Sequence, residues 1–225
     1  MIPVITLDGP SGSGKGTLSQ LLADKLGWHY LDSGAIYRMA AWAVLAKKIS
    51  LADETKLKAV LENLNLAIEL DKNHVPHYYC EGQEITQAIR EETCSMTASK
   101  IAAMPMVRSL LLQRQRDFRK APGLVTDGRD MGTIVFPDAS FKFFIMASME
   151  ERAKRRYLQL KSQRINGSLA RIQEDLEERD RRDRERSISP LKPASGAVVV
   201  DTTHLTVPEV LDVLGVILKR VANVN

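Results

Sequence analysis

The sequence predicts an α/β fold, in which helices cover both faces of a parallel sheet, and a small antiparallel β insert and a mobile helical lid are added to this core. Short apolar runs rich in β-branched residues alternate with segments whose apolar residues have helical spacing. A glycine-rich stretch, GPSGSGKGT, joins the first such run to the first helical segment. Three strand-like runs interrupt the alternation in the middle of the chain, and an arginine-rich segment follows later.

The composition is that of an ordinary globular protein. The 225 residues include 44% hydrophobic and 27% charged residues, and the formal net charge is +4. This length fits one large domain or one domain with an insertion. No apolar run approaches the roughly 18 to 20 residues of a membrane span, and the N-terminus lacks a signal-like segment, so we expect a cytoplasmic protein with no membrane partner. Cys80 and Cys94 predict neither a disulfide framework nor a zinc site.

The first predicted elements are a strand, a glycine loop and a helix. The β-branched residues at 4–7 predict a short buried strand. Apolar residues at helical spacing in 15–26 predict a helix, which Gly27 ends. A second strand is expected at 28–31, and the alanine-rich residues 35–47 predict a second helix.

The character of the chain changes after a third helix, which is expected at 53–63. Strand-like runs separated by turn residues predict a small antiparallel meander. We therefore expect 64–88 to be the core of an inserted subdomain that also uses parts of 89–120. The strands expected within it are 66–70, 75–80 and 84–85.

Alternating elements return in the rest of the chain. The helical spacing at 93–120 is expected to break before Pro105, because the residue preceding a proline disfavours the helical region. Ser148 and Glu151 predict a capping box at the start of a basic helix. The remaining expected elements are strands at 124–126, 141–146 and 198–200, and a final helix at 206–221.

The stretch GPSGSGKGT has the G-x-x-x-x-G-K spacing of a phosphate-binding loop. Glycines let backbone amides point inward, the following helix adds its positive end, and Lys15 adds a full charge. The stretch therefore predicts a P-loop NTPase-type sheet that binds polyphosphate, and a glycine-rich turn that happens to contain a lysine is the alternative. The expected ATP-binding residues of the loop are Gly9, Pro10, Ser11, Gly12, Ser13, Gly14, Lys15, Gly16 and Thr17.

One position departs from the usual loop pattern. Gly16 stands where a hydroxyl residue normally follows the lysine, and Thr17 comes one place later. We therefore expect Mg²⁺ to be held mainly by nucleotide phosphates and water, since this ion gives up its water reluctantly. Direct ligation by a protein side chain is not expected, although Asp127 could act through water.

The kind of phosphate enzyme is narrowed by the rest of the sequence. A GTPase would need an Asn-Lys-x-Asp motif, which is missing. A small-molecule kinase must neutralise the phosphates of both donor and acceptor, which requires several arginines besides Lys15. Two alternatives stay open: a kinase of the same fold with another acceptor, and a basic nucleic-acid-binding module at 151–186. Aromatic residues make up only 5% of the chain, which gives little support to base stacking.

Five separated motifs together resemble the bacterial cytidylate kinases. They are GPSGSGKGT, LDSGAIYR (31–38), IAAMPMVR (101–108), DGRDMGTIVFPDA (127–139) and ERDRRDRERSISPL (178–191), which follow in order over nearly the whole chain. The predicted meander also resembles the enlarged monophosphate-binding insert of that family. The resemblance implies a monomeric kinase of pyrimidine nucleotide metabolism that transfers the γ-phosphoryl group of ATP to CMP or dCMP. It also implies Mg²⁺ as the cofactor and no nucleic-acid partner.

The resemblance further implies how the acceptor phosphate is bound. Ser33 and Arg38 flank the start of a predicted helix, where a hydroxyl and a guanidinium could hold this phosphate together with Arg129. Ser33 could instead only cap the helix, and Arg38 could only form surface ion pairs.

Ser99, Arg108 and Asp130 resemble the cytosine-reading set of the family. A carboxylate, a guanidinium and a hydroxyl together complement the donor and acceptor groups of cytosine. Ser99 could equally be an ordinary serine on a helix surface. Asp127 follows a predicted strand, where it could orient the water of a magnesium ion or cap the next turn.

Residues 151–190 form the expected lid. Opposite charges three or four apart at 177–186, such as Arg179 with Asp183, could simply stabilise an exposed helix. The resemblance instead assigns Arg179 and Asp183 to the ribose and Arg186 to the acceptor nucleotide. It assigns the donor phosphates to Arg155, Arg156, Arg182 and Arg184, and makes Lys15, Arg129 and Arg179 the catalytic residues. The kinase core would then comprise 1–63, 89–150 and 191–225.

Overall fold

A computed structural model of the chain describes residues 1–71, 75–162 and 167–222. The chain divides into two compact units. The first unit consists of Met1–Asp32 and Arg116–Asn225, and the second of Ser33–Gln115.

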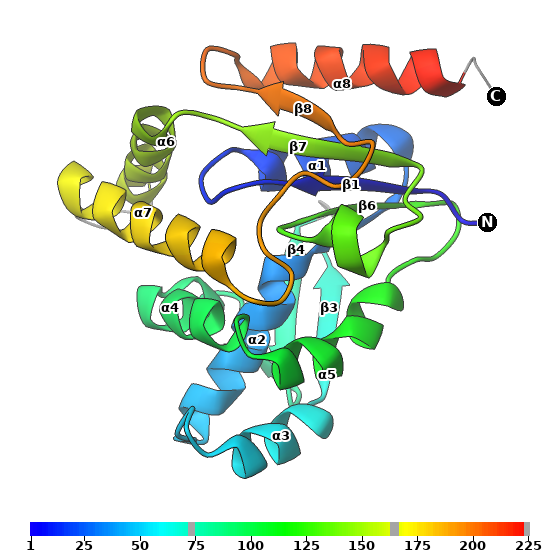
Figure 1. The fold of residues 1–225 in the computed structure, drawn as a ribbon. Coiled ribbons are helices and arrows are strands. Elements are labelled where there is room, and N and C mark those ends of the chain that lie inside the picture. The colour runs from blue at the N-terminus through cyan, green and yellow to red at the C-terminus, as the bar shows by residue number, and fades with distance from the viewer. Residues whose placement is uncertain (72–74, 163–166, 223–225) are drawn as a thin grey trace. The chain divides into compact units, whose positions relative to one another are not determined.

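The first unit contains a five-stranded parallel sheet with the order β2-β6-β1-β7-β8 (Figure 1). The central strand β1 (Val4–Asp8) pairs with β6 (Leu124–Gly128) and β7 (Phe141–Met146), and all five of its residues are buried. β2 (His29–Asp32) and β8 (Val198–Asp201) are the edge strands. Because the strands are parallel, the residues after the carboxyl ends of β1, β2 and β6 meet at one edge of the sheet.

Helices and a short turn complete the described part of the first unit. α1 (Lys15–Leu26) and α8 (Val207–Ala222) contribute to the apolar core of the sheet, and the turn η2 (Met131–Val135) follows β6. α6 (Met149–Ser162) and α7 (Leu169–Glu185) lie side by side (Figure 1). Their contact is an apolar cluster that includes Ala153, Ile172 and Leu176.

The second unit combines helices with a small antiparallel sheet of order β3-β4-β5. Its helix α2 packs against α4, the turn η1 and β4. The helical elements are α2 (Ser33–Ala46), α3 (Glu54–Glu62), η1 (Ala88–Arg90), α4 (Glu92–Ile101) and α5 (Pro105–Arg116), and the strands are β3 (Leu66–Leu70), β4 (Pro76–Cys80) and β5 (Gln83–Glu84).

The structure confirms the predicted fold class: a parallel sheet flanked by helices, with a small antiparallel sheet added. The break before Pro105 is also confirmed, because α4 ends at Ile101 and α5 begins at Pro105. Only half of the predicted capping box is present. The Ser148 hydroxyl accepts a hydrogen bond from the Glu151 amide at 3.2 Å, but the Ser148 amide donates to the Thr203 hydroxyl instead of the Glu151 side chain.

Some predicted bounds are wrong. The second helix begins at Ser33 and not at 35, so Ser33 is its first residue. Trp28 precedes β2 instead of belonging to it, and a Cβ on Gly123 would come within 2.4 Å of its indole ring. The turn η2 was not predicted because it depends on a distant partner, Asp8, whose carboxylate accepts hydrogen bonds from the first two amides of the turn.

Candidate active site

The glycine-rich loop lies between the end of β1 and the start of α1. A Cβ on Gly9 would come within 2.1 Å of the Ile145 carbonyl oxygen in β7, so only glycine allows this close approach. Gly14 has φ 88°, a left-handed conformation, directly before α1 begins at Lys15. The first amides of a helix have no partner within it, and its positive end faces the loop. The loop therefore has the local structure of an anion-binding site.

Lys15 is buried within a cluster of charged residues. The residue is only 7% exposed, and its Nζ donates a hydrogen bond to the Pro10 carbonyl oxygen at 2.9 Å. Burial and then the positive charge of Arg129 lower the pKa of Lys15 to about 7, against the opposing charges of Asp127 and Asp32. The charged form of Lys15 is therefore disfavoured in the folded protein, and a bound anion would stabilise it.

Two carboxylates lie beside Lys15 at the ends of neighbouring strands. Asp32 of β2 is in register with Asp127 of β6, and the Tyr30 hydroxyl donates to Asp127 Oδ1 at 2.8 Å. Burial and the nearby charge of Asp32 raise the pKa of Asp127 to about 7. A Cβ on Gly16 would lie 3.9 Å from Asp127 Oδ1, so the position after the lysine faces this carboxylate.

Sequence reasoning missed Asp32, although its place at the end of a predicted strand next to β6 was a usable signal. Thr17, one position after Gly16, is exposed. Over the described ranges 1–71, 75–162 and 167–222, no group of three or more His, Cys, Asp or Glu side chains is arranged to hold a metal ion. Within those same ranges, no helix has the length and apolar character needed to cross a membrane.

Asp8 fixes the turn η2, which directly follows Arg129 and Asp130. It is 2% exposed, and its two carboxylate oxygens accept hydrogen bonds from the amides of Met131 and Gly132, each at 2.8 Å. Burial outweighs these bonds and raises the pKa of Asp8 to about 6. Sequence reasoning also missed this residue, which ties the end of β1 to the loop after β6.

The loop after β6 is joined to helix α7. Arg129 Nε donates to Asp183 Oδ2 at 2.6 Å, and Arg186 Nη1 lies 4.0 Å from Asp183 Oδ1. Although burial opposes it, the Arg129 charge lowers the pKa of Asp183 below its usual value. Three predicted site residues, Arg129, Asp183 and Arg186, thus lie together in the first unit. The Arg186 Nε also donates to the Ser189 carbonyl oxygen.

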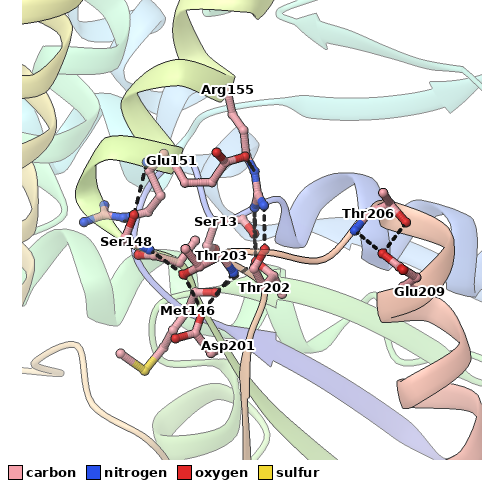
Figure 2. A network of polar contacts seen from close by, with 12 residues as sticks. Ser13, Met146, Ser148, Glu151, Arg155, Asp201, Thr202, Thr203, Thr206 and Glu209 are labelled. Atoms are coloured by element: carbon pink, nitrogen blue, oxygen red, sulfur yellow. Dashed lines mark hydrogen bonds and ion pairs between the residues drawn. The ribbon is translucent and has the colours of Figure 1, made fainter.

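Arg155 lies against the phosphate-binding loop in a polar network with the start of the β8–α8 connection (Figure 2). It donates to the Ser13 carbonyl oxygen at 3.3 Å and to the Thr202 hydroxyl and carbonyl oxygens at 3.1 and 2.6 Å. Its Nε contacts Glu151 Oε1 at 2.9 Å. Arg155 therefore connects α6 to the phosphate-binding loop and to the segment after β8.

The other lid arginines have local contacts. Arg156 donates to the Gln159 side chain of α6 at 3.0 Å. Arg182 lies 3.5 Å from Glu178, and Arg184 lies 3.6 Å from Asp180, each one turn away on α7. Arg179 is also on α7, and its charge contributes to lowering the pKa of Asp183.

Four predicted acceptor residues, Ser33, Arg38, Ser99 and Arg108, belong to the second unit. The Ser33 hydroxyl donates to Gln115 Oε1 at 2.8 Å, a partner that the sequence did not reveal. Arg108 is buried, donates to the Ala102 carbonyl oxygen at 3.0 Å and lies 5.6 Å from the centre of the Tyr37 ring.

Ser99 and Arg38 complete this set. The Ser99 hydroxyl oxygen is buried and has no hydrogen-bond partner among the described residues. Arg38 lies in α2, and its carbonyl oxygen accepts a bond from the Cys94 thiol. Asp130, the third residue of the predicted cytosine-reading set, is buried in the first unit directly before η2.

The sheet, the glycine loop and the buried lysine at the carboxyl ends of the strands define a P-loop phosphate-binding protein. Comparison with known sequences identifies the family, because the sequence profile described as cytidylate kinase matches residues 5–220. The chain belongs to the cytidylate kinase family, and the resemblance seen in the five motifs is confirmed.

Individual relatives match over most of their length. A cytidylate kinase of Stutzerimonas stutzeri (strain A1501) is 53% identical over 211 residues, which cover 93% of this chain and 92% of the relative. One from Coxiella burnetii is 54% identical and covers 92% of this chain and 88% of the relative. One from Aeromonas salmonicida is 53% identical, with 94% and 91% covered.

Proposed function

We propose that the protein transfers the γ-phosphoryl group of ATP to the phosphate of CMP or dCMP, giving ADP and CDP or dCDP. The observation that carries this proposal is the buried Lys15, which lies among Asp32, Asp127 and Arg129 at the sheet edge of a cytidylate kinase family member. In the reaction, an acceptor phosphate oxygen forms a bond to the γ-phosphorus while the bond between that phosphorus and the β–γ bridging oxygen breaks.

The donor phosphates bind to the loop that includes residues 9–17. The loop amides and the N-terminus of α1 favour the negative charge of the phosphates, and Lys15 leaves the Pro10 carbonyl oxygen to contact them. This charge stabilises the oxygens of the transferring group in the transition state. Arg155, Arg156, Arg182 and Arg184 remain the proposed lid arginines for these phosphates.

The carboxylate oxygens of Asp32 and Asp127 are suited to accept hydrogen bonds from the water molecules bound to a magnesium ion. Their mutual repulsion, which contributes to the raised pKa of Asp127, is relieved by a divalent cation. These two carboxylates would hold the water of a bound Mg²⁺, which would supply positive charge beside the donor phosphates. Tyr30 orients Asp127 through its 2.8 Å hydrogen bond.

The acceptor phosphate is assigned to Ser33, Arg38 and Arg129, and the ribose to Arg179 and Asp183. Arg186 is assigned to the same nucleotide. The ion pair between Arg129 and Asp183 supports this assignment, because it holds a guanidinium and a carboxylate of two separate elements at one place. Arg129 and Arg179 together with Lys15 stabilise the negative charge that shifts during transfer.

The cytosine ring is assigned to Ser99, Arg108 and Asp130. Support for Ser99 comes from its buried hydroxyl, which lacks a hydrogen-bond partner in the described part of the chain and can bond to a base. A wrong base would leave these groups unpaired, which makes burial the source of the discrimination.

A coupled ADP-release assay with MgATP tests the proposal. CMP, dCMP, UMP, AMP and GMP are offered separately at equal concentrations. Rapid turnover confined to CMP and dCMP is expected. Rapid turnover of another monophosphate would overturn the assignment of Ser99, Arg108 and Asp130 while keeping the loop and Lys15. The proposal includes a monomeric, cytoplasmic enzyme, and light scattering during gel filtration tests the monomer.

A further inference from the structure

Arg152 of α6 has no part in the function proposed above, yet its side chain is only 5% exposed. Its guanidinium contacts three segments of the first unit. It forms an ion pair with Asp180 Oδ2 of α7 at 2.7 Å and donates to the Ser11 carbonyl oxygen of the loop at 2.9 Å. A third bond, at 3.1 Å, goes to the Ala147 carbonyl oxygen between β7 and α6.

The phosphate-binding loop is packed directly on this arginine. Gly12 has φ 77°, and a Cβ there would come within 3.2 Å of Arg152 Cβ. Arg152 donates to the carbonyl oxygen of Ser11. Arg155, one turn later in α6, donates to that of Ser13 (Figure 2). Two arginines of one helix therefore fix alternate carbonyl groups of the loop.

Asp180 of α7 is the buried ion-pair partner of Arg152. It is 1% exposed, and its second cation, Arg184, is 63% exposed at 3.6 Å. The apolar cluster of Ala153, Ile172 and Leu176 already joins α6 to α7. A buried ion pair contributes little net stability compared with apolar packing, but it restricts the geometry of the elements that it joins. The Arg152–Asp180 pair is therefore better suited to determine where α7 lies than to add stability to its packing.

Asp183 lies almost one turn after Asp180 on α7 and forms the ion pair with Arg129. α7 is thus fixed at two neighbouring points. Asp180 connects it through Arg152 to the donor loop, and Asp183 connects it to Arg129, which we assign to the acceptor phosphate.

We propose that Arg152 is a positioning residue that, through Asp180, sets the register of helix α7 relative to the phosphate-binding loop. The planar guanidinium contacts the loop, the segment between β7 and α6, and α7 at once. A lysine, with a single charged nitrogen on a flexible chain, does not reproduce this geometry. The donor loop and the Arg129–Asp183 pair are then held in fixed relation before the nucleotides bind.

The test compares Arg152→Lys and Asp180→Asn with matched controls on exposed positions of α7, Arg171→Lys and Glu174→Gln. MgATP affinity is measured by calorimetry without acceptor. The kcat and both KM values are measured at least 15 °C below the melting temperature of each variant. We expect Arg152→Lys to weaken MgATP binding about tenfold and Asp180→Asn to lower kcat about tenfold, because misplaced groups lose catalysis steeply. The controls should stay within twofold.

A purely structural role predicts a different result: lower melting temperatures with unchanged MgATP affinity and kcat, which would overturn the proposal. If Asp180→Asn does not fold, Asp180→Glu is used, because it keeps the charge and moves the carboxylate by one methylene. The kcat of Asp180→Glu should still fall severalfold, and an unchanged kcat would also overturn the proposal. The kinetic arm rests on the proposed function, whereas the binding arm does not. A wild type that binds MgATP but turns over a different acceptor would refute the proposed acceptor, and a tenfold loss of MgATP affinity in Arg152→Lys would still support this inference.

Discussion

Replacing Lys15 by methionine should slow phosphoryl transfer strongly and at the same time stabilise the folded protein. Burial and the charge of Arg129 lower the pKa of Lys15 from 10.5 to about 7. Since one pKa unit corresponds to about 1.4 kcal/mol, holding this ammonium charged in the folded state costs about 5 kcal/mol. Methionine fills a similar volume without a charge and removes that cost.

Two losses reduce the gain. The hydrogen bond from Lys15 to the Pro10 carbonyl oxygen disappears, which costs about 1 kcal/mol. Asp127 and Asp32 also lose a nearby cation, although Asp127 can take up a proton because its pKa is about 7. If the lost attraction to these carboxylates costs about 2 kcal/mol, the net gain is about 2 kcal/mol. This corresponds to a rise of about 4 to 8 °C in melting temperature for a chain of this size.

The pH dependence has a defined sign. Because the pKa of Lys15 is lower in the folded state than in the unfolded state, the folded state binds fewer protons between pH 7 and 10.5. The cost is therefore fully present below about pH 7 and is lost as the pH rises towards 10.5. The stability difference between Lys15→Met and the wild type should shrink accordingly at high pH.

Thermal unfolding without nucleotide at pH 6.5, 8 and 9.5 measures this effect. Lys25→Met, an exposed substitution on the same helix, is the control and should melt within about 2 °C of the wild type. The kcat of Lys15→Met should fall about 10³-fold, because the transition state loses a charge. A melting temperature below that of the wild type, or a difference that does not shrink with rising pH, would refute the reasoning.

Three further predictions concern single side chains. Ser99→Ala should raise the KM for CMP about tenfold and leave the KM for ATP unchanged. The melting temperature should also stay unchanged, because the buried hydroxyl has no hydrogen-bond partner among the described residues. An unchanged KM for CMP would remove Ser99 from the site. Asp8→Asn turns an amide group towards one of the backbone N–H groups of Met131 and Gly132, so the turn that follows Arg129 should shift. The kcat in steady-state assays should then fall at least about tenfold, and a wild-type kcat would show that this turn needs no carboxylate. Gly123→Ala places a Cβ within 2.4 Å of the Trp28 ring, so calorimetry should show that the free energy of unfolding falls by about 1 to 3 kcal/mol. The kcat at 15 °C should stay within about twofold of the wild type, and an unchanged melting temperature would mean that the ring moves freely.

Local signals in the sequence were sufficient to predict most of the fold. The alternating strands and helices, the glycine loop before Lys15 and the break before Pro105 depend on residues within a few positions of one another. These are the features that the structure confirms.

The missed site residues depend on contacts between distant parts of the chain. Asp8 bonds to the Met131 amide across 123 positions, and Arg152 bonds to the Ser11 carbonyl across 141 positions. In the sequence, Asp8 is one more residue of a strand, and Arg152 is one of several basic residues in a helix. Only the folded chain distinguishes the buried Arg152 from the exposed Lys154, two positions later.

The most direct test of the proposed acceptor is a competition experiment with the wild-type protein. An equimolar mixture of CMP, dCMP, UMP, AMP and GMP is incubated with limiting MgATP, and the products are separated by ion-exchange chromatography. We predict that CDP and dCDP form first and take up nearly all of the transferred phosphate. Formation of UDP, GDP or additional ADP from AMP at a comparable rate would contradict the assignment of this chain to cytosine nucleotides.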